Sequence, residues 1–303
     1  MKARLVWLIL CCIWGSTWLF IKIGLKDLPP LTFAGIRFVI ASAILIAIVA
    51  VRRLPFSDLI TNWRLLALTG VLSFSFNYGF IFWGEQYISS GLAALLQATI
   101  PAFGLVFAHF YLPGERITPR KVTGVVLGIL GVGVVFSNQL TVGGEKSLAG
   151  CVAIVLSSII VAYSNVLVKA RGKHIDPVIM AAGQMLFGLI PLLVIGISLE
   201  GNPVYYRWTM RAVVSLFYLA IVGSVIAFVL YYWLVRKIDV TKSMLIALVT
   251  PVVAVIVGII VLGERINWRT LLGGAMIISG IGFLVTLHRK KKPVIDLVST
   301  TAL

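Results

Sequence analysis

Residues 82–136 read FWGEQYISSGLAALLQATIPAFGLVFAHFYLPGERITPRKVTGVVLGILGVGVVF. A second version follows about 150 residues later, where residues 232–285 read YWLVRKIDVTKSMLIALVTPVVAVIVGIIVLGERINWRTLLGGAMIISGIGFLV. Pro101 recurs as Pro251, and the other matched positions keep their order. They are Trp83, Ile88 and Gly114-Glu115-Arg116-Ile117 in the first copy, and Trp233, Ile238 and Gly263-Glu264-Arg265-Ile266 in the second. This repetition predicts a chain built from two copies of one unit.

The repeat extends toward the N-terminus. At a shift of 147 residues, the matched positions are Thr17, Lys22 and Pro30 with Ser164, Lys169 and Pro177. We therefore divide the chain into a first repeat at residues 1–145, a second repeat at residues 146–288 and a basic tail at residues 289–303.

Composition places the chain in a membrane. Hydrophobic residues make up 60% of it and charged residues only 12%, with a mean hydropathy of +1.07. Soluble domains contain about 45–50% hydrophobic residues and about 25% charged residues. The net charge of +16 does not indicate nucleic-acid binding, because the basic residues lie in short gaps between apolar runs. Cys11, Cys12 and Cys151 lack metal-ligand spacing, so we expect neither a metal nor another cofactor.

Ten apolar runs reach the length of about 20 residues that a membrane helix needs. They are residues 5–25, 31–51, 65–84, 91–112, 121–138, 149–168, 178–199, 211–233, 242–262 and 270–287. With the N-terminus in the cytoplasm, the inside segments hold 18 lysines and arginines and the outside loops hold six. Since cytoplasmic loops carry the excess of positive charge, we expect both termini in the cytoplasm.

Each repeat contains five predicted helices, so the second copy must cross the membrane with the opposite orientation. The predicted fold class is an all-α polytopic membrane protein, with ten transmembrane helices arranged as two inverted five-helix repeats. This arrangement is typical of secondary transporters, which handle substrate near the membrane midplane between the repeats.

Pro101 and Pro251 lie midway along the fourth and ninth predicted helices. Proline lacks an N–H group and displaces the carbonyl four residues earlier, which deprives Gln97 and Ala247 of their helical partners. Inside a membrane such backbone belongs against protein or a wet cavity. We expect these two helices to line the pathway, and a packing kink without a role in transport is the alternative.

Trp14, Trp18 and Lys22 recur at intervals of four and share one face of the first helix. Arg37 lies about two turns into the second helix. A charge inside a membrane indicates a functional site by default. Extension of the Lys22 or Arg37 side chain to the nearby interface is the alternative.

Several amide and aromatic side chains at membrane depth suit a small amphipathic substrate. They are Asn77, Tyr78, Gln97, Asn165 and Tyr232. An interfacial aromatic belt is the alternative for such residues, and we favour it for Trp83 and Trp233.

Energy coupling leaves little trace in the sequence. All ten acidic residues fall in loops or at helix ends, and Glu85 and His109 are the candidates for proton coupling. The chain has no GxxxxGKS or GxxxxGKT phosphate-binding loop, so we expect no direct use of ATP.

Glycine-rich faces on the fifth and tenth helices predict close helix packing or the contacts of a homodimer.

Four features together resemble the EamA family of the drug/metabolite transporter superfamily. They are Trp14-Gly15-Ser16-Thr17, the segment from Pro30 to Arg37, the run YISSGLAALLQATIP at residues 87–101, and Gly114-Glu115-Arg116 with its echo at Gly263. The resemblance covers nearly the whole chain. It implies a central cavity lined by helices 1, 3, 4, 6, 8 and 9. It also implies a bacterial or archaeal inner-membrane carrier, often an exporter of amino acids or related metabolites.

The resulting hypothesis is an alternating-access exporter of a zwitterionic or anionic, amino-acid-like metabolite, with membrane lipids as its surroundings. Lys22 and Arg37 attract the carboxylate, and Pro101 and Pro251 shape the site. The residues expected to contact the substrate are Trp14, Trp18, Asn77, Tyr78, Gln97, Asn165 and Tyr232.

Three rival functions stay open. Efflux of lipophilic cations calls for a carboxylate at membrane depth, which the sequence does not place there. Uptake of a vitamin or nucleoside is compatible with inverted repeats. A lipid-modifying membrane enzyme calls for clustered Asp, His or Cys at one membrane face, and the sequence contains no such cluster.

Overall fold

The structure is a computed structural model, and it describes residues 3–113, 119, 122–124, 126–128, 130–131, 133–134, 144–238, 243, 246–263 and 267–286. Helices dominate these residues, and no strand occurs among them. The predicted basic tail and the Gly114-Glu115-Arg116-Ile117 motif lie outside the described residues. Of the second copy of this motif, only Gly263 is described.

Seven described segments are long and apolar enough to cross a membrane, and Val249–Leu262 is apolar but shorter. The seven are Ala3–Gly24, Pro30–Val51, Trp63–Glu85, Ser90–Tyr111, Gly144–Arg171, Pro177–Glu200 and Met210–Lys237. They agree closely with seven of the predicted runs. The protein is therefore an all-helical, multi-pass membrane protein, and the total of ten helices stays a prediction.

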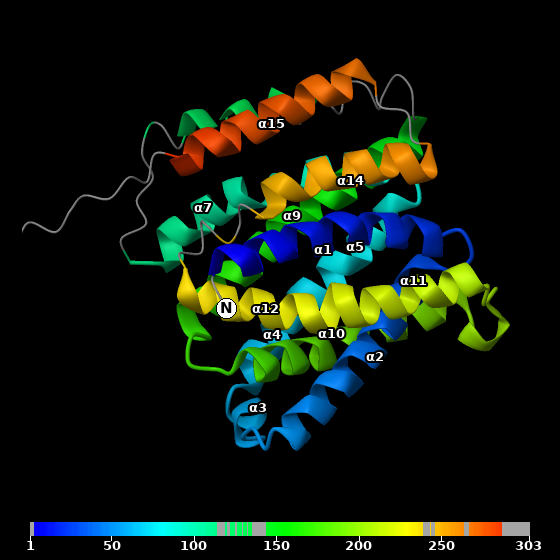
Figure 1. Cartoon of the computed structure of the whole chain (residues 1–303), viewed down its shortest axis with the longest axis vertical. Coiled ribbons are helices and arrows are strands. Elements are labelled where there is room, and N and C mark those ends of the chain that lie inside the picture. Colours follow the sequence, from blue (N-terminus) through cyan, green and yellow to red (C-terminus); the bar gives the residue numbers. More distant parts are fainter. Residues whose placement is uncertain are drawn as a thin grey trace, which may run out of the picture.

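The helices follow one another in the order shown in Figure 1. The first half contains α1 (Ala3–Gly24), α2 (Pro30–Val51), α3 (Ser57–Thr61), α4 (Trp63–Gly70), η1 (Val71–Phe76), α5 (Asn77–Glu85), α6 (Ser90–Gln97) and α7 (Ile100–Tyr111). The second half contains α9 (Gly144–Arg171), α10 (Pro177–Glu200), η2 (Pro203–Tyr205), α11 (Met210–Ala220), η3 (Ile221–Ile226), α12 (Ala227–Lys237), α14 (Ile246–Leu262) and α15 (Trp268–Thr286).

Local sequence sets several helix boundaries. Pro30 and Pro177 lie in the first turns of α2 and α10, where a missing N–H group costs nothing. Asp176 caps α10 by accepting a 2.8 Å hydrogen bond from the backbone N–H of Val178. Gly201 ends α10 with a φ of +88°, a conformation that residues with a side chain rarely adopt.

The two halves pack into each other. α1 packs against α11, α12 and α14 of the second half, while α9 packs against α4, α5, α6 and α7 of the first half. α2 and α10, the second helix of each half, also pack together. In Figure 1, α1 lies between α14 and α12, and α15 lies at one edge of the molecule.

Glycines bring α15 close to Gly124 and Gly131. A Cβ atom added to Gly131 would lie 2.6 Å from the carbonyl oxygen of Gly273, and one added to Gly280 would lie 2.6 Å from that of Gly124. Any larger residue at Gly131 or Gly280 would push the backbones apart. These glycines therefore serve close packing within the chain, and the homodimer stays a prediction.

Two π-helical turns occupy corresponding positions in the halves. η1 spans Val71–Phe76 and η3 spans Ile221–Ile226, so both bounds differ by 150 residues. A π turn is one residue wider than an α turn and often marks a functional site. Both turns lie within long membrane helices, between α4 and α5 and between α11 and α12.

Candidate functional site

A cavity lies between the two halves and offers about 130 Å³ to the centres of water-sized molecules. One water needs about 10–15 Å³ on this measure, so the cavity has room for a small organic molecule. Its walls come from α1, η1, α5, α6, α7, α9, α12, α14 and Ser243. These are the six helical regions that the family resemblance implied.

Seven residues predicted to contact substrate line this cavity. They are Trp14, Trp18, Asn77, Tyr78, Gln97, Asn165 and Tyr232. Sequence reasoning missed Thr17, Ser73, Ser243 and Thr250, which add hydroxyl groups to the lining. The position of Thr250 in the lining could have been predicted from the sequence, because Thr250 directly precedes Pro251. Among the described residues that line the cavity, none is charged.

Pro101 and Pro251 act on the lining through their neighbours. The residues four and one before Pro101 are Gln97 and Ile100, and both line the cavity. Ala247 and Thr250 hold the same positions before Pro251 and line it too. Both helices thus contribute to the cavity lining, whereas both prolines are themselves buried outside it, and a role of the two helices in a transport pathway stays a prediction.

The backbone differs between the two prolines. α6 ends at Gln97, and α7 begins at Ile100 with Pro101 in its first turn, so the fourth span is broken. α14 continues through Pro251. The amide of Gln97 is held in place, because its Nε2 donates a 2.6 Å hydrogen bond to Ser157 Oγ.

Two polar atoms of the lining residues are buried without a hydrogen-bond partner among the described residues. They are Asn77 Oδ1, an acceptor, and Trp14 Nε1, a donor. Asn77 is fixed by its other end, since its Nδ2 donates a 3.1 Å hydrogen bond to the carbonyl of Ser73. An unpaired buried polar atom costs about 1–3 kcal/mol, which a ligand in the cavity can relieve.

Arg37 is 1% exposed and lies behind Tyr78 rather than in the cavity lining. Its guanidinium carbon is 4.8 Å from the centre of the Tyr78 ring. Its Nε donates a 2.8 Å hydrogen bond to Ser224 Oγ, and its Nη2 donates a 3.2 Å hydrogen bond to the carbonyl of Gly223. Both acceptors belong to η3. The described part of the chain supplies no carboxylate to pair with this charge.

Gln184 occupies the position that corresponds to Arg37 in the second half. It is fully buried, and its Oε1 accepts a hydrogen bond from the Tyr232 hydroxyl. Its Nε2 donates a 2.6 Å hydrogen bond to Thr69 Oγ1. Arg37 and Gln184 therefore each support a tyrosine of the cavity wall, but only Arg37 brings a charge.

Lys22 does not line the cavity. Its Nζ donates hydrogen bonds of 2.5 and 2.6 Å to the carbonyls of Glu85 and Ile88, at the end of α5. Lys169 does the same at the end of α12, where it donates to Val235 and Ile238 at 2.7 and 3.1 Å. Both lysines thus cap the C-terminal end of a membrane helix, where a positive charge is favourable.

The two candidates for proton coupling also lie away from the cavity lining. The carboxylate of Glu85 is buried at the end of α5. His109 is exposed in the last turn of α7. Within the described residues, no cluster of three His, Cys, Asp or Glu side chains could hold a metal ion.

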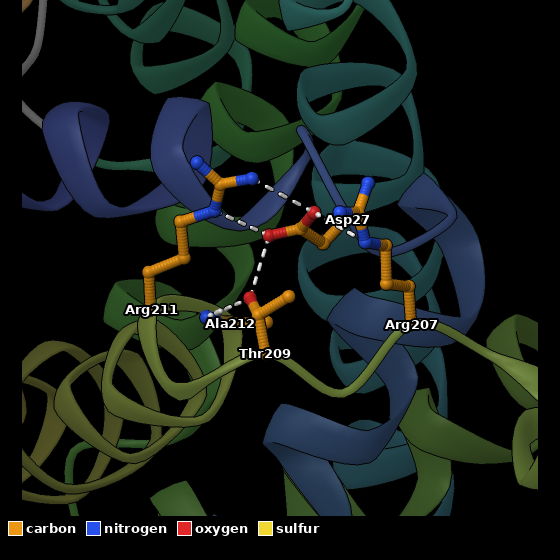
Figure 2. A network of polar contacts seen from close by, with 5 residues as sticks. All are labelled: Asp27, Arg207, Thr209, Arg211 and Ala212. Atoms are coloured by element: carbon orange, nitrogen blue, oxygen red, sulfur yellow. Dashed lines mark hydrogen bonds and ion pairs between the residues drawn. The ribbon is translucent and has the colours of Figure 1, made fainter.

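An ionic cluster joins the two halves at one end of the bundle (Figure 2). Asp27, between α1 and α2, accepts hydrogen bonds of 2.6 and 3.1 Å from Arg211 and 2.6 Å from Thr209. Arg207 lies 3.8 Å from the same carboxylate. The hydrogen bonds from Arg211 and Thr209, with the nearby positive charges, lower the pKa of Asp27 to about 2. The Asp27 side chain is 0% exposed.

Comparison with known proteins identifies the kind of molecule. The EamA-like transporter family matches residues 1–137 and again residues 148–286. The uncharacterized transporter YoaV of Bacillus subtilis is 30% identical over 269 residues, which cover 89% of this chain and 91% of that protein. The uncharacterized inner membrane transporter YedA of Escherichia coli is 32% identical, with coverage of 93% and 91%.

A further relative in Escherichia coli is named a probable amino-acid metabolite efflux pump. It is 26% identical over 295 residues, with coverage of 95% of this chain and 96% of that protein. A solved crystal structure matches the fold with a TM-score of 0.71 at 20% identity, covering 95% of this chain and 99% of the other. At that identity the likeness concerns the fold alone.

Proposed function

The chain belongs to the EamA-like transporter family, and we propose that it exports an amino acid or a related small metabolite by alternating access. The observation that carries this proposal is the cavity between the halves, lined by hydroxyl, amide and aromatic groups. The relative named as an amino-acid metabolite efflux pump supports the same substrate class.

The substrate is zwitterionic or anionic. Trp14 Nε1 can donate to a carboxylate, and Asn77 Oδ1 can accept from an ammonium group, so the two unpaired atoms have the chemistry to bind the two charged groups of an amino acid. Arg37 adds a positive charge behind Tyr78, in a low-dielectric interior where such a charge acts over several ångströms. Lys22 contributes positive charge from its position at the end of α5.

Alternating access would use two inverted five-helix repeats at residues 1–145 and 146–288, with both termini in the cytoplasm. Support comes from the paired features of the halves, namely the π turns η1 and η3 and the lysine caps Lys22 and Lys169. Rocking of one half against the other would expose the cavity to each side in turn. A homodimer through the glycine-rich helices would leave this movement intact.

The lining argues against efflux of lipophilic cations, because it presents no carboxylate among the described residues. The lining residues that the structure describes also include no acidic, histidine or cysteine side chain of the kind that a lipid-modifying enzyme requires. Proton coupling through Glu85 or His109 would act from outside the cavity, and we retain both residues as candidates.

Counterflow in proteoliposomes tests the proposal. Labelled amino acids, their derivatives, a nucleoside and a lipophilic cation are each offered with and without a pH gradient. We expect counterflow of at least one amino-acid-like compound and none of the lipophilic cation. Counterflow of only the nucleoside or the cation would refute the substrate class.

A further inference from the structure

A second hollow lies where α4 begins and α9 ends, and it shares no lining residue with the central cavity. It offers about 490 Å³ to the centres of water-sized molecules. Trp63 and Arg64 from α4 and Leu167 and Arg171 from α9 line it. Since these residues stand at the first and last turns of two membrane segments, the hollow opens at the boundary between lipid and water.

The positive charge of the hollow is uncompensated. Arg64 and Arg171 are both exposed, and within the described part of the chain neither forms an ion pair. The guanidinium carbon of Arg64 lies 5.6 Å from the centre of the Trp63 ring. Guanidinium groups bind phosphate strongly because their N–H groups match two phosphate oxygens at once.

Most of the remaining lining is apolar, beside the polar side chains of Thr61 and Asn62. Leu68, one turn further into α4 from Arg64, is 49% exposed, and Leu167 forms a buried floor. Trp63 is 50% exposed, and tryptophan favours the headgroup level of a membrane. A ligand that fits both parts carries an anionic phosphate at one end and a hydrocarbon chain at the other.

We propose that this hollow is a binding site for an anionic phospholipid. The phosphate lies at Arg64 and Arg171, and an acyl chain runs over Leu68 toward the membrane interior. Free phosphate shares the headgroup chemistry but leaves the apolar part of the hollow unused. Under the proposed orientation the site faces the cytoplasmic leaflet, where anionic lipids attract basic residues near the membrane surface.

Native mass spectrometry of the full chain tests this site. The protein is purified from membranes, delipidated, and titrated with phosphatidylglycerol or phosphatidylcholine of the same acyl chains. The variant is Arg64→Gln combined with Arg171→Gln. The matched control is Arg52→Gln, because Arg52 is an exposed arginine at the same end of the bundle but outside the hollow.

We expect the wild type and the Arg52→Gln control to retain one phosphatidylglycerol in preference to phosphatidylcholine. The double variant should lose this preference, with at least about a threefold drop in bound phosphatidylglycerol, a change of about 0.65 kcal/mol. Equal retention of the two lipids by the wild type, or an equal loss in the control, would overturn the proposal. Displacement of the lipid by millimolar inorganic phosphate would assign the site to phosphate instead. The melting temperature in detergent checks that the double variant is folded.

Discussion

The guanidinium carbon of Arg37 lies 4.8 Å from the ring centre of Tyr78, so a buried cation stands directly behind a wall of the central cavity. The cation is held there by two hydrogen bonds to η3, a π turn of the other half. Arg37 thereby joins α2 of the first half to η3 of the second half, directly behind the cavity wall.

Replacement of Arg37 by Gln should weaken transport of a carboxylate substrate by roughly tenfold, because a unit charge attracts a carboxylate about 10 Å away by about 1.7 kcal/mol at an effective dielectric constant of about 20. An uncharged substrate analogue should be carried almost unchanged. The measurement is counterflow of both compounds, normalised to folded protein. Arg37→Lys keeps the charge and should recover much of the activity. An equal loss for the two compounds would show that Arg37 serves only the fold.

Replacement of Pro101 by Ala should join α6 to α7 and return a helical partner to the carbonyl of Gln97. Since proline is tolerated in the first turn of a helix, we expect a nearly unchanged melting temperature together with several-fold slower transport. Pro191→Ala is the matched control, because Pro191 lies inside α10 and away from the cavity. Equal transport by the two variants would count against a role for the break in α6–α7.

Lys22→Met should lower the free energy of unfolding, because each hydrogen bond from a charged group contributes about 1.5–3 kcal/mol to stability and the variant loses those of Lys22. Lys169→Met should behave alike, since Lys169 caps α12 in the same way. Denaturant titration measures the free energy of unfolding of both variants. If Lys22→Met folds normally but loses only carboxylate substrates, then Lys22 acts in substrate recognition.

The ionic cluster at Asp27 should stabilise the protein in a pH-dependent way. The pKa of Asp27 is lowered in the folded state, from 3.8 to about 2. The stabilisation is therefore complete above about pH 4 and is lost as the pH falls through about 2. We expect the difference in melting temperature between the wild type and Asp27→Asn to be constant from pH 7 to 5 and to shrink below pH 4. Asp58→Asn is the control, because Asp58 forms no ion pair among the described residues, and a pH-independent difference for Asp27→Asn would contradict this account.

The sequence predicted features that local chemistry determines. Pro101 and Pro251 located the cavity-lining helices because a missing N–H group has the same effect wherever it occurs in a membrane helix. Trp14 and Trp18 were placed on one face by their spacing, and the structure brings both to the cavity.

Features that depend on distant partners could not be predicted. Arg37 reaches Ser224, 187 residues away in the sequence, and no periodicity reports such a contact. Lys22 gave the signal of a substrate-binding cation, yet its Nζ lies against backbone carbonyls of another helix. The π turns have no glycine or proline signature in common, so η1 and η3 appear only in the folded chain.

The matching π turns also bear on the history of the chain. Each amounts to one extra residue in a membrane helix, and one residue turns everything after it by about 100° around the helix axis. Loss of that residue from η1 would carry Asn77 and Tyr78 off the cavity wall, and loss from η3 would do the same to Tyr231 and Tyr232. Because the extra residue lies at the same register in both copies, the simplest account places it in the ancestral repeat unit, before that unit was duplicated. Both halves then inherited the same helix register, and loss of the extra residue from either half alone would move residues of the cavity wall.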